Sequence, residues 1–456
     1  MQQRHIARIL DLVPPDSQQI LNTSVPEARR RVLSGNPEAV LSIHGSFALV
    51  ARDGEQVCLA RSLDRPFRYF LAKEASGPML VVAERIDTIR EALEREGYLD
   101  QFHPSYTRMV PAHHITSLRL VGCPDPNPTY QRFFDPPREI LPPDLDLIGE
   151  RYMRAVCEEL RTWLLAIPVE EPIGVLFSGG VDSGAVLLCL YHEVLAAGQS
   201  PARLKAFTLS VDGGGEDLEQ AREFLRRTEL EVLGEVVEVG ALQLDPLAAV
   251  AVIEDYKPLD VECATMNLAL LEGIRCRYPS WRLLVDGDGD DENLKDYPIE
   301  ENSELTIRSV VSNLLLYQEG WGVNSIKHSL TYSGGLSRAY VRTYAPARRL
   351  GFSGFSPYTR PRVVAVAEAI PFGQLTQGSH EALYRLKGEI LSRGVRRVAG
   401  LELPVVPKRR FQPGVASENV FASRFGVHPE HYRSHFLRLH KLSGEEARWT
   451  PAASAR

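Results

Sequence analysis

A pair of glycines followed by a carboxylate stands between an apolar run and an amphipathic segment. Ser178-Gly179-Gly180-Val181-Asp182-Ser183 comes directly after IGVLF (173–177). Adjacent glycines let a backbone close around an anion, and the free N–H groups at the start of the next helix face that anion. Because Asp182 would repel a phosphate, we interpret it as a ligand of Mg²⁺ bound to phosphates. The pattern predicts an ATP site, and a Gly-Gly turn with a capped helix is the structural alternative.

The glycine spacing in 178–183 differs from that of a Walker loop and no lysine follows it, so that type of phosphate site is excluded.

A second candidate segment carries several carboxylates directly after an apolar run, in LLVDGDGDDENLKDY (283–297). A strand that ends in small residues and acids suits a second Mg²⁺ ligand and a base, whereas an acidic turn in solvent is the alternative.

A third candidate is the cation Lys408, which begins the basic stretch 408–410. Reactions at phosphate and carbonyl groups build negative charge on oxygen, and a fixed cation stabilises that charge. A basic loop at the surface is the alternative interpretation of the same stretch.

Together these segments resemble the ATP pyrophosphatases that adenylate their substrates, and among them asparagine synthetase and β-lactam synthetase. SGGVDS resembles the pyrophosphate-releasing loop of that superfamily. The segment 283–297 resembles the synthetase sequence LSGEGSDEIFGGY, in step from Asp286 to Tyr297. The segment 390–416 lies without gaps on the synthetase stretch that carries the catalytic lysine. The resemblance covers about residues 145–425.

The resemblance implies a role for each matched residue. Asp182 and Asp291 would hold Mg²⁺, and Lys408 would be the catalytic lysine. Asp288 stands where the family has a glutamate or tyrosine near the attacking amine, and would act as the base. ATP would be bound by Leu176, Ser178, Gly179, Gly180, Val181, Asp182, Ser183, Leu209 and Gly287.

The implied activity is an ATP-dependent ligase that forms an amide bond through an acyl-adenylate and releases AMP and pyrophosphate. Its substrates would be a carboxylate of a small molecule or peptide and an amine or ammonia, in specialised biosynthesis. Two alternatives stay open: an altered ATP-binding pseudoenzyme or scaffold, and an ATP pyrophosphatase that modifies tRNA.

The sequence departs from the family at two places, which bear on the nitrogen source and on the acceptor substrate. Asparagine synthetases begin with a cysteine that hydrolyses glutamine, but this chain reads Met1-Gln2-Gln3. Because 45–70 still resembles the glutaminase body, we expect a glutaminase-like domain without its nucleophile and without that activity. In 350–364 the Glu and Arg of the family fall on Ser353 and Phe355, which indicates a rebuilt acceptor pocket. Nearby arginines suit an acidic acyl substrate or a surface equally: Arg348, Arg349, Arg360 and Arg362.

The elements that position these residues change in type along the chain. Before Arg138, short apolar runs alternate with turn residues and predict strands at 45–54, 56–64, 67–72 and 78–84, with a helix at 86–97. The proline-dense segment 124–144 is the predicted linker. Strands then alternate with helices, which predicts a mostly parallel, doubly wound sheet.

The predicted fold is therefore α/β with an N-terminal β-rich α+β part. We assign 1–140 to a glutaminase-like domain of the N-terminal-nucleophile hydrolase type, and 141–435 to an ATP pyrophosphatase domain with a helical extension. Residues 436–456 are expected to form a tail.

Composition narrows the class of protein further. The 456 residues carry a formal charge of −7, which disfavours electrostatic binding of nucleic acid or an anionic membrane by the protein as a whole. No apolar run is long enough for a membrane helix, and no signal peptide is recognisable at the start. The six cysteines are scattered, which disfavours a disulfide scaffold and favours the cytoplasm. The oligomeric state is not readable from the sequence.

Overall fold

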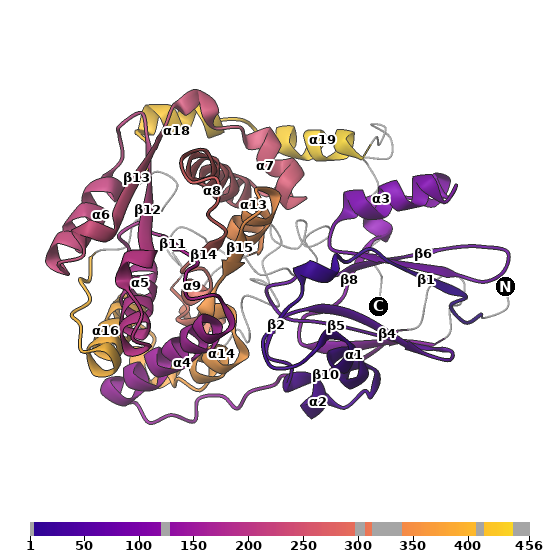
Figure 1. Ribbon diagram of the computed structural model, residues 1–456, viewed down its shortest axis with the longest axis horizontal. Helices are drawn as coiled ribbons and strands as arrows, with labels where there is room; N and C mark the ends of the chain where they lie inside the picture. Colours follow the sequence, from indigo (N-terminus) through magenta and orange to yellow (C-terminus); the bar gives the residue numbers. More distant parts are fainter. Residues whose placement is uncertain (1–3, 120–127, 297–305, 312–339, 407–414, 441–456) are drawn as a thin grey trace.

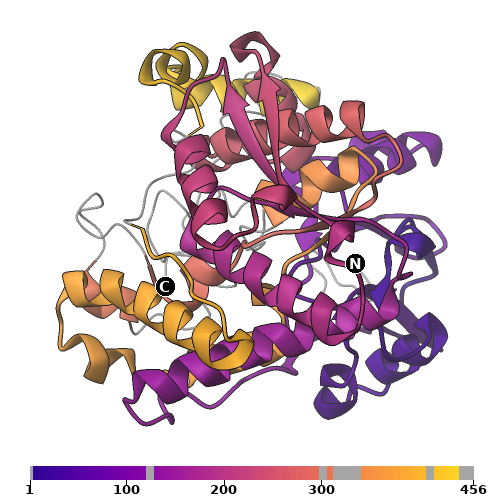
Figure 2. The same ribbon diagram turned by 60° about the vertical axis from the view of Figure 1, so that its left-hand side comes forward.

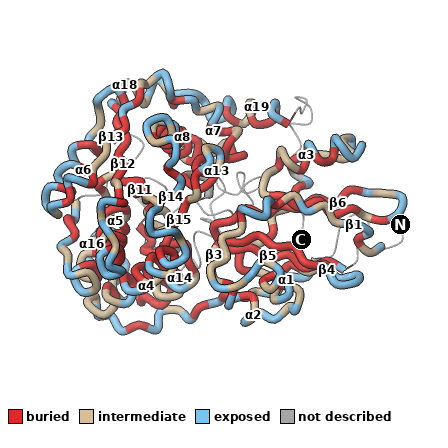
Figure 3. Tube along the Cα trace, viewed as in Figure 1, coloured by how far each residue is buried: buried red, intermediate tan, exposed pale blue. Residues whose placement is uncertain are grey.

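The computed structural model describes residues 4–119, 128–296, 306–311, 340–406 and 415–440. A β-rich N-terminal part lies beside a parallel sheet that is covered by helices (Figure 1). This arrangement confirms the predicted mixed α/β class, with strands first and a parallel sheet later. Buried segments run through the strands of both parts (Figure 3).

Two four-stranded sheets are stacked in the N-terminal part. One has the order β1-β7-β6-β8 and the other the order β10-β9-β5-β4. Their inner faces share one apolar cluster, in which Val57 and Leu59 of one sheet meet Tyr69 and Leu80 of the other. The strands are β1 (Arg8–Asp11), β4 (Ala48–Asp53), β5 (Gln56–Arg61), β6 (Arg68–Ala72), β7 (Met79–Ala83), β8 (Arg108–Met109), β9 (His114–Leu118) and β10 (Thr129–Arg132).

Helices cover the outer faces of this pair of sheets. Helix α3 (Ile86–Arg95) packs on β6 and β7, and α1 (Val25–Leu33) packs on β4 and β5. The short pair β2 (Gln19–Ile20) and β3 (Gly45–Ser46) and helix α2 (Pro37–Leu41) complete the part. The predicted strands at 45–54, 56–64, 67–72 and 78–84 and the predicted helix at 86–97 are confirmed.

The five-stranded sheet of the C-terminal part is parallel throughout, with the strand order β13-β12-β11-β14-β15. Its strands are β11 (Ile173–Leu176), β12 (Leu204–Val211), β13 (Gly234–Val239), β14 (Leu283–Val285) and β15 (Ser353–Phe355). Strand β15 was not predicted, because three residues with a central glycine give no usable alternation. The predicted doubly wound sheet is otherwise confirmed.

Helices cover both faces of this sheet, because its strands carry apolar side chains on both. Leu204 and Ala206 face a cluster that contains α4 (Leu145–Ala166) and α5 (Val181–Ala196), whereas Phe207 and Leu209 face α8 (Pro258–Arg277). Alternate residues of a strand point to opposite faces, so β12 is apolar on both. The other helices are α6 (Glu216–Arg227), α7 (Pro246–Ile253), α9 (Asp290–Asn293), α10 (Ile307–Val311), α13 (Ala345–Arg349), α14 (Pro361–Glu368), α15 (Phe372–Thr376), α16 (His380–Ala399), α18 (Glu418–Phe425) and α19 (Pro429–Leu439).

Two features bear on the predicted boundaries. The predicted linker 124–144 is wrong in part, because strand β10 (Thr129–Arg132) lies within it and pairs with β9. Residues 134–144 contain no helix or strand. Helix α19 continues to Leu439, across the boundary predicted at 435. In the described part of the chain, every helix is too short or too polar to cross a bilayer.

Helices α4 and α16 lie side by side (Figure 2) and meet through glycines. A Cβ atom added to Gly394 would lie 2.3 Å from the carbonyl oxygen of Gly149 and 2.4 Å from Cγ of Met153. The two backbones therefore approach too closely for any side chain at this crossing. The contact fixes α16 against α4, and both helices carry residues of the site described below.

We predict that Gly394→Ala lowers the free energy of unfolding by about 1–3 kcal/mol, because the helices must separate to admit a methyl group. Urea unfolding measures this loss. Ser392→Ala, on the same helix, is the control and should be nearly neutral. Equal stability of the two variants would contradict the close crossing.

Candidate active site

The glycine pair lies at the carboxyl end of β11, near the middle of the parallel sheet. Gly179 has φ +76°, a left-handed conformation, and an added Cβ would lie 2.5 Å from the backbone nitrogen of Ala221. Gly180 is the N-cap of α5 and has no side chain to accept from the first turn. The N–H groups and positive dipole end of a 16-residue helix therefore face the loop, which suits an anion.

The other predicted ATP contacts surround this loop. The Ser183 hydroxyl donates to the carbonyl of Gly180, and the backbone of Gly180 donates to the Ser178 hydroxyl. A Cβ on Gly287 would lie 2.9 Å from the backbone nitrogen of Ser183, so the turn after β14 touches the loop. Leu176 pairs with Phe207 in the sheet, which brings Leu209 of β12 beside the same edge. Val181 begins α5.

The acidic segment after β14 folds into a turn and the short helix α9. Asp286 Oδ1 accepts hydrogen bonds from the backbone of Asp288, at 3.0 Å, and from the Ser356 hydroxyl, at 2.6 Å. Asp290 Oδ1 accepts from the Tyr152 hydroxyl of α4 at 2.7 Å. Burial raises the pKa of both Asp286 and Asp290. Those two acids therefore shape the turn, which leaves Asp288 and Asp291 for chemistry.

A lysine that the sequence analysis missed joins the two proposed metal ligands. The ammonium of Lys387, on α16, lies 2.6 Å from Asp182 Oδ1 and 2.5 Å from Asp291 Oδ1. Asp296 and Asp290 lie 3.4 Å and 3.7 Å from the same nitrogen. The Lys387 side chain is only 4% exposed, and the surrounding carboxylates hold its pKa well above the ordinary value despite burial. The signal was a lysine on the apolar stripe of α16, between Leu383 and Ile390.

The geometry fits a triphosphate and Mg²⁺. Asp182 and Asp291 direct oxygens to one point, now filled by the ammonium, at the end of the anion-binding loop. Mg²⁺ is commonly held by one or two carboxylates together with phosphate oxygens and water. The described residues contain no group of three or more potential ligands set around a metal position, so phosphates would have to complete the shell.

Asp288 occupies a separate, buried position nearby. The Thr343 hydroxyl donates to its Oδ2 atom at 2.5 Å. Burial raises the pKa of Asp288 to about 6, while Arg342 and the Thr343 hydrogen bond oppose the rise. A carboxylate with a pKa near 6 is ionised at neutral pH and is a stronger base than an exposed one.

The sequence of the region that bears this site matches a known family. Residues 169–381 match the family model described as asparagine synthase. This region is therefore similar to the asparagine synthase family. Members of that family use ATP, and the match supports an ATP-dependent family of the ligase type. Lys387 lies six residues past the matched range.

Other comparisons add little to this assignment. No curated protein matches the chain. The structure of NMN synthetase from Francisella tularensis is 11% identical, and the alignment covers 57% of this chain and 99% of that chain, with a TM-score of 0.25. A likeness at this level carries no conclusion about site or substrate.

Several residues that the sequence analysis singled out are not seen at this site. Lys408, the predicted catalytic lysine, and Tyr297 fall outside the described residues. The Ser353 hydroxyl accepts a hydrogen bond from Gln19, in the N-terminal part. Arg360 is buried against Asp64, at 3.3 Å, and Arg362 pairs with Glu158. These two arginines are thus engaged within the protein and give no support to an acidic acyl substrate.

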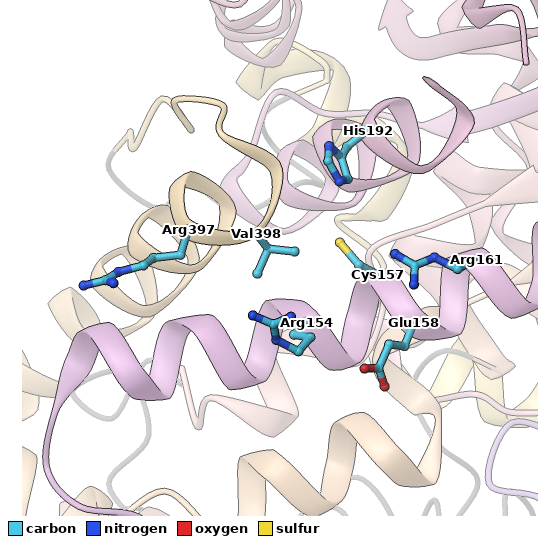
Figure 4. A pocket seen from close by; sticks show the side chains of 7 residues that line it. All are labelled: Arg154, Cys157, Glu158, Arg161, His192, Arg397 and Val398. Carbon is cyan, nitrogen blue, oxygen red and sulfur yellow. The ribbon is translucent and has the colours of Figure 1, made fainter. Parts of the chain in front are cut away.

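A cavity of about 250 Å³ is lined by residues of α4, α5 and α16, none of which belongs to the nucleotide loop (Figure 4). Its lining is basic, but each arginine has a carboxylate partner: Arg154 has Glu150, Arg161 has Glu193, and Arg397 has Asp146. Figure 4 shows Arg397 pointing away from the other cationic groups. We therefore assign no role to this cavity.

We predict that Lys387→Met lowers the free energy of unfolding by about 3–5 kcal/mol, because buried carboxylates lose their cation. Added Mg²⁺ should restore part of that stability, and more than it adds to the wild type. Thermal unfolding with and without Mg²⁺ measures both effects.

Lys205→Met is the matched control, since Lys205 pairs with Glu235 at a partly exposed site and should contribute only about 0–1 kcal/mol. If the two variants lose equal stability, Lys387 does not neutralise the carboxylates.

Proposed function

We propose that the chain is an ATP-dependent ligase that forms an amide bond through an acyl-adenylate, in specialised biosynthesis. The observation that carries the proposal is the meeting of Asp182, Asp291 and Lys387 at the end of the SGGVDS loop. A helix N-terminus, a fixed cation and two Mg²⁺-type ligands at one point suit a triphosphate whose β- and γ-phosphates leave together.

In the first step, a carboxylate oxygen of the substrate would bond to the α-phosphorus of ATP while the α–β anhydride bond breaks. The loop N–H groups and Lys387 would hold the departing pyrophosphate, whose negative charge they balance. Mg²⁺ held by Asp182 and Asp291 would neutralise further phosphate charge.

In the second step, an amine would attack the carbonyl carbon of the adenylate, and AMP would leave. Asp288 would take the proton that the amine loses, which its raised pKa and buried position favour. Lys408 stays the predicted stabiliser of the tetrahedral oxyanion. The absence of glutaminase activity also stays a prediction.

Two substitutions should separate the steps. Asp182→Asn should abolish exchange of labelled pyrophosphate into ATP, because the first step needs that carboxylate. Asp288→Asn should keep exchange but slow amide formation by about 10²–10⁴-fold, the usual contribution of a general base. Asp53→Asn, at the exposed end of strand β4, is the control and should match the wild type.

The assay would screen carboxylic acids with ATP and Mg²⁺. Release of ADP and phosphate in place of AMP and pyrophosphate would contradict the proposal. Stabilisation by Mg·ATP with no pyrophosphate release from any acid would favour the pseudoenzyme.

A further inference from the structure

A buried segment of the N-terminal part, RSLDRPFR (61–68), contacts residues that lie close to the candidate site. This segment connects β5 and β6, and its arginines Arg61, Arg65 and Arg68 are each at most 1% exposed. Charged groups are rarely buried so completely unless they are paired, so the contacts of these side chains identify what the segment holds.

The Arg65 side chain is held in place by residues of the N-terminal part itself. Its guanidinium donates to the backbone carbonyl and the hydroxyl of Ser17 and pairs with Glu84. The same guanidinium lies over the ring of Tyr344, with 5.7 Å between Cζ and the ring centre. A cation over an aromatic face is attractive, more so when both are buried. Arg65 therefore connects the N-terminal part to Tyr344 of the second part.

Tyr344 ends a π-helical turn, Tyr340–Tyr344, in which Thr343 and Arg342 act on the candidate base Asp288. Thr343 donates its hydroxyl to Asp288, and the Arg342 guanidinium lies 3.7 Å from Asp260 and favours the ionised form of Asp288. Turns of this type occur frequently at functional sites. Because Thr343 directly precedes Tyr344 in the chain, a shift of Tyr344 would also displace Thr343.

A second contact supports the same region. Asp64 pairs with Arg360, and the Arg360 guanidinium lies 4.8 Å from the ring centre of Phe355 in β15. Arg360 follows the turn Pro357–Thr359, in which the Tyr358 hydroxyl donates to the carbonyl of Asp182 in the nucleotide loop. Two neighbouring residues of the segment 61–68 therefore contact different neighbours of the acidic turn: Arg65 contacts Tyr344, and Asp64 contacts Arg360.

We propose that Arg65 and Asp64 are positioning residues of the N-terminal part: Arg65 holds Tyr344 so that the adjoining Thr343 keeps Asp288 oriented. Asp64 holds Arg360 beside the turn that bonds to the nucleotide loop. The inference rests on the proposed function, because Asp288 matters to the reaction only as its base. It assigns the β-rich part a role in amide formation that needs no chemistry of its own.

The ionisation of Asp288 is the readout, and it requires no substrate. The charged groups that act on Asp288 are Arg342, Asp286, Asp291 and Glu292. Because the pKa of Asp288 in the folded protein is about 6, above the ordinary 3.8, the protein loses stability relative to Asp288→Asn as pH rises from about 4. That loss levels off near pH 6, at the pKa of the folded state.

The experiment compares wild type, Thr343→Val and Arg65→Met, each with and without Asp288→Asn, by thermal unfolding from about pH 4 to pH 8. Thr343→Val should move the level-off point upward by about one pH unit, because a hydrogen bond to the ionised form is lost. Arg65→Met should move it in the same direction. In the double variant Arg65→Met/Thr343→Val the two shifts should be less than additive.

Two controls separate positioning from general damage. Arg52→Met removes an arginine that donates only within the N-terminal part, to the carbonyls of Ile6, Ala7 and Gly54, and should leave the level-off point unchanged. Arg65→Lys keeps a cation and should restore most of the wild-type profile. If Arg65→Met does not fold, Tyr344→Leu tests the same link from the other side, with the same expected shift.

The inference would be overturned if Arg65→Met levelled off at the same pH as Arg52→Met while Thr343→Val levelled off at a higher pH. Wild-type protein that releases no pyrophosphate with any acid would instead contradict the proposed function and leave this unfolding test intact.

Discussion

The buried ammonium of Lys387 is the constraint on which the site depends. It lies among the carboxylates of Asp182, Asp290, Asp291 and Asp296, which come from α5 and from the segment after β14. Without a central cation, like charges at these distances would repel strongly in a buried site. Lys387 therefore fixes the nucleotide loop and the acidic turn relative to each other before any ligand binds. The close crossing of α4 and α16 at Gly149 and Gly394 sets where that cation can lie.

The strand order explains why these segments meet. β11 and β14 are neighbours in the parallel sheet, so the loop after one and the turn after the other emerge at the same edge. Ligands of open α/β sheets bind at that carboxyl edge. β15 extends the edge by one strand, and the residues after it, Ser356 and Tyr358, bond to Asp286 and to the loop. The N-terminal part then packs against this last strand, through the contacts of Asp64 and Gln19.

Sequence patterns were sufficient for the loop and the parallel sheet because both depend on local signals. Glycine at 179 is required by a left-handed backbone, and β11, β12 and β14 are apolar runs flanked by helices. Lys387 was missed because a lone lysine in an amphipathic helix carries no local sign of its partners, Asp291 and Asp182, which lie 96 and 205 residues away in the chain. β15 and the Arg65–Tyr344 contact depend likewise on tertiary packing. The arginines near 350–362 were ambiguous in sequence, and only their contacts distinguish pairing within the protein from substrate binding.

The most direct measurement is a crystal structure of the protein with Mg²⁺ and the α,β-methylene analogue of ATP, which cannot release pyrophosphate. We predict that the β- and γ-phosphates lie against the N-terminus of α5 and contact Lys387, with Mg²⁺ on Asp182 and Asp291. A nucleotide bound elsewhere, or phosphates that leave Lys387 paired with the carboxylates as before, would contradict the assignment of this site.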